Sequence, residues 1–198
     1  MAYYHRVMTR EDVKKRLGRL NFSARTLFAL CCVTHGRSTF FTCLDADDCG
    51  WYEEQVPMID DFWNSFPGSL NSKSIQERHA AASKLLDFKD YLEFESYQFA
   101  VGEHALIAAT IDAFDCSFSA ESFDNPTNAA YQIYWAIVQA EIIEKGEGTD
   151  ESWLTRLEAQ NAICRSEIDF QLKCLRVIEN WQGPLPNYEE VEIAIESL

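Results

Sequence analysis

Five residues near the start of the chain have the side chains that zinc prefers as ligands. Four thiols and one imidazole lie within nineteen residues, at Cys31, Cys32, His35, Cys43 and Cys49, and structural zinc sites use thiolate and imidazole ligands. However, no Cys-x-x-Cys pair is present, and the two adjacent cysteines point to different faces of a helix. We therefore expect packed or free thiols and no metal or other cofactor, with a zinc site as the alternative.

Motifs of the common catalytic classes are absent from the sequence. It contains no GxSxG, GxxxxGK[ST], GxGxxG or HExxH segment, which are markers of hydrolases, nucleotide-binding enzymes and zinc proteases. We predict a non-catalytic protein. Acids within apolar helical patterns are candidates for buried carboxylates, which are frequent at functional sites, although structural pairing is the commoner role. From these we select Glu103 and Asp112, together with the amide Asn161, as a buried polar site.

The chain is strongly acidic, and its charge is unevenly distributed. It has 32 Asp and Glu residues against 17 Lys and Arg residues, for a net charge of -15, which disfavours binding of the whole surface to nucleic acid or to an anionic membrane. Residues 1–26 carry seven basic and two acidic residues, whereas 38–72 carry seven acidic residues and no basic one. The acidic stretches are either solvated faces that keep the protein soluble or a surface for a cationic partner.

The acidic segment that begins at residue 45 also contains two aromatic residues. Aromatic side chains are frequent anchors at protein interfaces, and carboxylates complement a basic surface and speed association with it. We predict that a basic protein partner docks on this segment. The partner-binding residues would be Asp45, Asp47, Asp48, Trp51, Tyr52, Glu53 and Glu54.

Signals for helices dominate the chain. Apolar residues recur at spacings of three and four between cap residues, glycines and prolines, and only a short segment at 38–44 shows the alternation of a strand. Residues 97–118 are apolar nearly all round, which favours a central helix. Helices are predicted at 23–35, 51–66, 74–88, 97–118 and 125–145, and the one at 23–35 is expected to stop at Gly36. A further helix is predicted to begin at residue 9, a long one to run from 149 or 150 to about 182, and a short one to follow Asn187.

Length and composition agree with one helical domain. With 198 residues, of which 47% are hydrophobic and 25% charged, the chain can bury a core without disulfides. We predict an all-α fold, with residues 1–198 forming a single-domain bundle of about seven helices around the central apolar helix. Trp63, Trp135 and Trp153 are expected to anchor its core.

Neither a secretory signal nor a membrane span is indicated. The first residues lack the apolar segment of a signal peptide, and the longest apolar run, Leu27 to Val33, is far shorter than a membrane-spanning helix requires. The seven cysteines form an odd set without framework spacing. We expect a cytoplasmic protein with reduced thiols.

Several segments resemble one bacterial family. Near the start these are Arg16-Leu17-Gly18-Arg19-Leu20, Phe28 and Cys31, Phe40-Phe41-Thr42-Cys43, Tyr52 and Asp60-Asp61-Phe62-Trp63. The stretches Gly102 to Leu106 and Glu158 to Arg176 agree more loosely. Together they resemble the YjaG-like bacterial proteins, a family of unknown function. The resemblance spans most of the chain and rests on packing residues. It implies a cytosolic all-α domain and transfers no catalytic residue.

The chain also resembles a functional type of bacterial protein, namely the small acidic helical immunity proteins of toxin systems. Such proteins cover a toxin surface, and carboxylates supply complementarity where the toxin is a basic nuclease. We therefore expect a non-catalytic immunity protein that neutralises a cognate toxin through an acidic surface. The alternative is a cytosolic housekeeping protein of the YjaG-like class that binds a small ligand or acts as a regulator.

Overall fold

The structure is a computed structural model that describes residues 10–42, 59–60, 63–64, 66, 77, 80, 108–113, 124–145, 156 and 159–198. Within these residues every regular element is a helix and there is no strand. The predicted all-α class is therefore confirmed for this part of the chain. The number of seven helices and the single domain over 1–198 stay predictions. Of the proposed central helix only 108–113 is described, and it is helical, with Ala109 and Ala113 buried.

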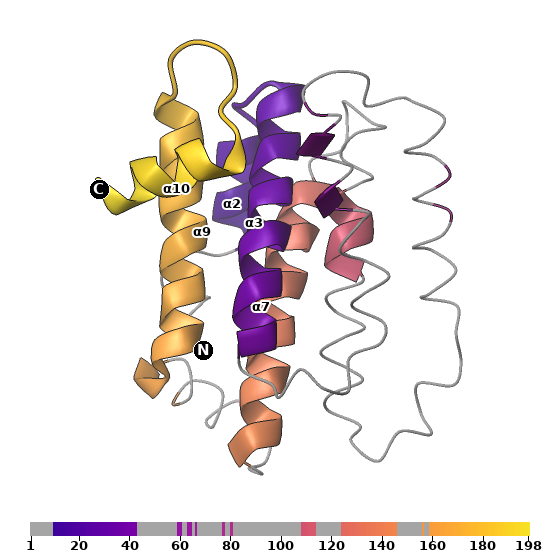
Figure 1. Cartoon of the computed structure of the whole chain (residues 1–198), viewed down its shortest axis with the longest axis vertical. Coiled ribbons are helices and arrows are strands. Elements are labelled where there is room, and N and C mark those ends of the chain that lie inside the picture. The colour runs from indigo at the N-terminus through magenta and orange to yellow at the C-terminus, as the bar shows by residue number, and fades with distance from the viewer. Residues whose placement is uncertain are drawn as a thin grey trace.

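Three long helices run side by side along the long axis of the molecule (Figure 1). These are α3 (Phe22–Thr42), α7 (Asp124–Lys145) and α9 (Ala162–Asn180). The shorter α2 (Arg10–Leu17) packs against α7, and α10 (Tyr188–Glu196) crosses α9 near one end. None of the helices in the described part of the chain is both long and apolar enough to cross a membrane.

Helix α3 is longer than the sequence predicts. Its start agrees, because the side chain of Asn21 accepts a hydrogen bond from the backbone N–H of Ala24 and satisfies a donor that the first turn leaves open. Its predicted stop at Gly36 is wrong, since the helix continues to Thr42. A Cβ at Gly36 would overlap the side chain of Ile133 on α7. This glycine therefore allows close approach of α3 to α7 and does not end the helix.

Helix α9 is shorter than the sequence predicts. Residues 156 and 159–160 are helical, but Asn161 leaves the helical conformation, with φ of -79° and ψ of 121°. Its side-chain oxygen accepts hydrogen bonds from the backbone N–H groups of Ile163 and Cys164 at 2.8 and 3.0 Å. The prediction of one uninterrupted helix through Asn161 is therefore wrong, because this residue is the N-cap of a new helix.

The turn between α9 and α10 agrees with the sequence prediction. Gly183 has a φ of 105°, a conformation that favours glycine, and Nε1 of Trp181 donates to the carbonyl of Pro184 at 2.8 Å. Asn187 caps α10, as predicted, in a reciprocal pair with Glu190. This turn reverses the chain so that α10 lies back on α9.

The described core consists of two adjoining clusters of buried side chains. One lies mainly between α3 and α7, and the other joins α2, α3, α9 and α10. Trp63 packs against both clusters and donates from Nε1 to the hydroxyl of Thr34 at 2.9 Å, while Trp135 packs against the first. Both tryptophans are core anchors, as predicted, and Trp153 lies outside the described residues. Among the described residues, four cysteines are buried and form no disulfide, namely Cys31, Cys32, Cys164 and Cys174.

Candidate functional site

A network of hydrogen-bonded polar side chains connects α3 with α9. Nδ1 of His35 lies 2.8 Å from Oε2 of Glu167, whose side chain is 0% exposed. The amide of Gln171 donates to Oε1 of the same carboxylate at 2.8 Å and to the carbonyl of Ala130 on α7 at 2.9 Å. A buried carboxylate needs such partners because burial removes its hydration. These hydrogen bonds between His35, Glu167, Gln171 and the backbone of Ala130 therefore link all three long helices.

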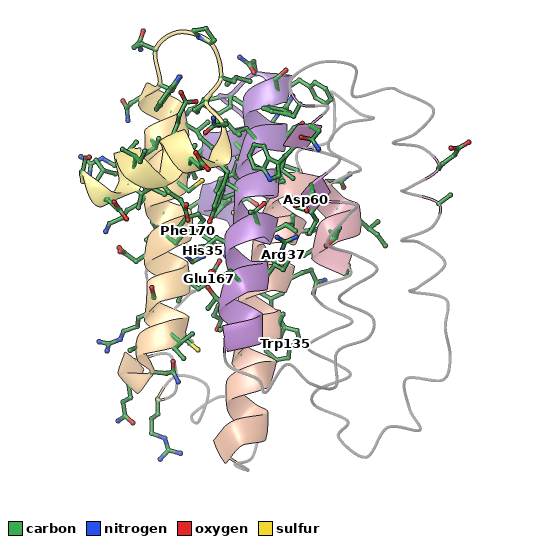
Figure 2. All side chains as sticks on the ribbon, viewed as in Figure 1. His35, Arg37, Asp60, Trp135, Glu167 and Phe170 are labelled. Carbon is green, nitrogen blue, oxygen red and sulfur yellow. The ribbon has the colours of Figure 1, made fainter. Side chains whose placement is uncertain are left out.

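The fold fixes the imidazole of His35 on a second side. Its ring stacks on that of Phe170, with centroids 3.6 Å apart and planes 5° from parallel. Glu167, Phe170 and Gln171 are three and four residues apart on α9, so that they share the face turned toward α3. Figure 2 shows His35, Glu167 and Phe170 together between these two helices. Since a carboxylate only accepts, Nδ1 is the donor in this contact and Nε2 is left for another group.

His35 borders a pocket of about 320 Å³ between α9 and α10. This volume is at the lower end of the range for ligand sites and suits one small molecule or one side chain. Phe170, Ile195 and Leu198 supply its apolar lining. The polar residues around it are His35, Ser166, Asp169, Lys173, Glu192 and Glu196.

Carboxylates outnumber cations around this pocket. Nζ of Lys173 lies 2.9 Å from Asp169, so one carboxylate is paired with the lysine. Glu192 accepts a hydrogen bond from the hydroxyl of Tyr188, and burial together with this contact raises the pKa of the tyrosine well above its ordinary value. Glu196 is exposed and has no ion pair with a described residue. The pocket is therefore rich in hydrogen-bond acceptors and negative in charge.

The buried thiols of α3 and α9 do not form a metal site with other described residues. Burial, followed by the hydrogen bond with Cys174, raises the pKa of the Cys31 thiol well above its ordinary value. The described residues contain no group of three His, Cys, Asp or Glu side chains arranged to hold a metal ion. Of the five residues considered for zinc, Cys43 and Cys49 lie outside the described part of the chain. Nδ1 of His35 is bonded to Glu167.

Basic residues of the N-terminal segment are used inside the fold. Arg16 forms two hydrogen bonds to the carboxylate of Glu179 on α9, at 2.8 and 2.6 Å, and Lys14 lies 2.6 Å from Asp124 at the start of α7. The hydrogen bond to Glu179 raises the pKa of Arg16. Arg25 is only 6% exposed. Arg16 and Lys14 therefore join α2 to α9 and to α7.

The structure describes only two of the predicted site residues, Asp112 and Asn161. All seven predicted partner-binding residues, from Asp45 to Glu54, lie outside the described residues, as does Glu103. Asp112 is partly buried in the helical stretch 108–113, and Asn161 is buried but uses its oxygen as a helix cap. The contact between His35 and Glu167 was not predicted. Its one signal in the sequence was a polar pair, Glu167 and Gln171, spaced four apart beside an apolar row.

No protein-family model, curated protein or solved structure matches this chain. Its function must therefore be argued from the site itself. A neutral imidazole that donates from Nδ1 to a buried carboxylate can accept a hydrogen bond at Nε2. Together with the carboxylates of α10, this arrangement favours a ligand that donates hydrogen bonds and carries positive charge.

Proposed function

We propose that the protein has a non-catalytic binding role and acts as an immunity protein that neutralises a cognate bacterial toxin through an acidic surface. The observation that carries this proposal is the internal use of cations. Arg16, Lys14 and Lys173 pair with carboxylates of the same chain at 2.6 to 2.9 Å. With a net charge of -15, the excess carboxylates are left to face a partner, and such a surface attracts a basic protein.

The segment from Asp45 to Glu54 is the proposed contact region. It follows α3 directly in the sequence and combines five carboxylates with Trp51 and Tyr52. Aromatic residues surrounded by charge are a common composition for an interface that is both specific and fast to form. The partner is a basic toxin protein, and we place the complex in the cytoplasm, without a membrane or nucleic acid as a partner.

The pocket beside His35 favours a second candidate function. This candidate is a cytosolic housekeeping protein of the YjaG-like class that binds a small ligand or acts as a regulator. The pocket of about 320 Å³ has room for such a ligand. It lies between α9 and α10, whereas the polar site predicted from the sequence at Glu103, Asp112 and Asn161 stays a prediction.

Calorimetric titration with the product of the adjacent gene tests the first proposal. We expect saturable binding that weakens as salt is added, because exposed charge pairs are screened. The double variant Asp47→Lys/Asp48→Lys should weaken binding strongly. Its matched control, Glu11→Lys/Glu189→Lys, changes the net charge equally at exposed positions outside the segment and should bind nearly as the wild type. Equal weakening in both variants, or no binding at all, would count against the proposal.

A further inference from the structure

The pocket beside His35 presents acceptors on two of its sides. Glu192 and Glu196 are four residues apart on α10, so both carboxylates lie on the helix face that borders the pocket. His35, from α3, also lines the pocket, and its Nδ1 lies 2.8 Å from buried Glu167. In the neutral imidazole that donates from Nδ1 to this carboxylate, Nε2 is a hydrogen-bond acceptor. Acceptors from α3 and α10 therefore border one small volume.

The apolar part of the pocket suits a long hydrocarbon stem. Phe170 forms part of the lining beneath the imidazole, and Ile195 and Leu198 line the α10 side. Side chains that carry a charged group on a methylene chain bury the chain against such surfaces while the charge meets polar groups. The combination of apolar walls and several acceptors is what one basic side chain requires.

We propose that this pocket binds the guanidinium group of one arginine side chain of the partner protein. Guanidinium is planar and has five N–H donors in a fixed fork, so it can bond to a carboxylate and to Nε2 of His35 at once. An ammonium group has a single donor centre and matches such spread acceptors less well. Glu196 supplies the carboxylate without an ion pair to a described residue, and Lys173 stays paired with Asp169.

This inference rests on the proposed function, because it assigns an arginine of the basic partner to a defined pocket. The arginine pocket and the proposed immunity function can nevertheless be tested separately. A complex with the adjacent gene product that forms without any arginine in this pocket would overturn the inference and leave the proposed function standing. If an arginine probe binds in this pocket but no protein partner binds, the proposed function is overturned and the pocket's affinity for guanidinium stands.

The probe is N-acetylargininamide, titrated into the 15N-labelled full chain and followed by NMR. We expect saturable shifts at the backbone of Ser166, Phe170 and Glu196 and at the imidazole of His35. The uncharged isostere N-acetylcitrullinamide should bind at least about tenfold more weakly, because charge-assisted hydrogen bonds are lost.

A matched pair of variants locates the site. Glu196→Gln removes a carboxylate from the pocket, and we expect it to weaken binding of the arginine probe by about five- to tenfold. Glu189→Gln makes the same change at an exposed position of α10 that does not line the pocket, and should leave the affinity unchanged. The inference is overturned if the two isosteres bind equally, if shifts do not saturate, or if the two variants weaken binding alike.

Discussion

Nδ1 of His35 and Oε2 of Glu167 lie 2.8 Å apart, although 132 positions separate the two residues in the sequence. The contact joins α3 to α9 and holds the imidazole at the edge of the pocket. Because Gln171 bonds to the other carboxylate oxygen and to the backbone of α7, one buried acid contacts side chains of α3 and α9 and orients the imidazole at the edge of the pocket.

Removal of the buried carboxylate should destabilise the fold. We expect Glu167→Ala to lower the free energy of unfolding by about 2 to 3 kcal/mol, because His35 and Gln171 lose their partner and a cavity remains. Urea denaturation measures this change. Exposed Glu189→Ala, on α10, is the control and should stay within about 0.5 kcal/mol of wild type. Equal stability of the two variants would show that the hydrogen bonds of Glu167 contribute nothing to the free energy of unfolding.

A methyl group at Gly36 should destabilise the protein despite its better helix propensity. In an exposed helix, Gly36→Ala would gain about 1 kcal/mol, but here the new Cβ overlaps Ile133, and overpacking costs about 1 to 3 kcal/mol. We therefore expect net destabilisation in urea unfolding. In an Ile133→Ala background the cost of Gly36→Ala should largely disappear. A stabilised single variant would refute the close approach of α3 and α7.

The cap of α9 should be replaceable by another cap residue. Asn161→Ala removes the acceptor of two backbone N–H groups and should cost about 1 kcal/mol, whereas Asn161→Asp should retain most of the stability. Thermal unfolding followed by circular dichroism compares the two variants. If Asn161→Asp is as unstable as Asn161→Ala, the side chain does not act as a cap.

Stability should fall at alkaline pH. The folded-state pKa of Cys31 is raised above its ordinary 9.0, and that of Tyr188 above its ordinary 10.0. Both groups ionise more readily in the unfolded chain, so their contribution is complete below about pH 9 and decreases as the pH rises further, by at most about 1.4 kcal/mol per pH unit for each group.

The variants Cys31→Ala and Tyr188→Phe test this pH dependence. Urea midpoints measured between pH 8 and pH 11 should decline less steeply in each variant than in the wild type, because one linked group has been removed. A decline of the same slope in all three proteins would mean that these groups do not control alkaline stability.

Local signals allowed much of the fold to be predicted. The cap at Asn187, the turn at Gly183 and the core tryptophans Trp63 and Trp135 follow from residue type and spacing, because each acts on neighbours in the sequence or on an apolar face. Gly36 and Asn161 were misread for a single reason. A glycine can end a helix or allow two helices to approach, and an asparagine can interrupt a helix face or cap a new helix, so the choice depends on tertiary packing.

The site was less predictable than the fold. His35 was considered only as a zinc ligand, because nearby cysteines suggested it, whereas its partner Glu167 lies on a helix far along the chain. The spacing of Glu167 and Gln171 indicated a shared helix face, but nothing local indicated which residue of α3 would meet it. The carboxylate contact region from Asp45 to Glu54 stays a prediction, since it lies outside the described residues.

Growth of a bacterial host that expresses the product of the adjacent gene tests the central claim most directly. The proposed immunity function predicts that this product arrests growth, that co-expression of the present chain restores growth, and that Asp47→Lys/Asp48→Lys loses the protection while Glu11→Lys/Glu189→Lys retains it. Arrest that is unchanged by the wild-type chain, or a neighbour without any effect on growth, would contradict the account.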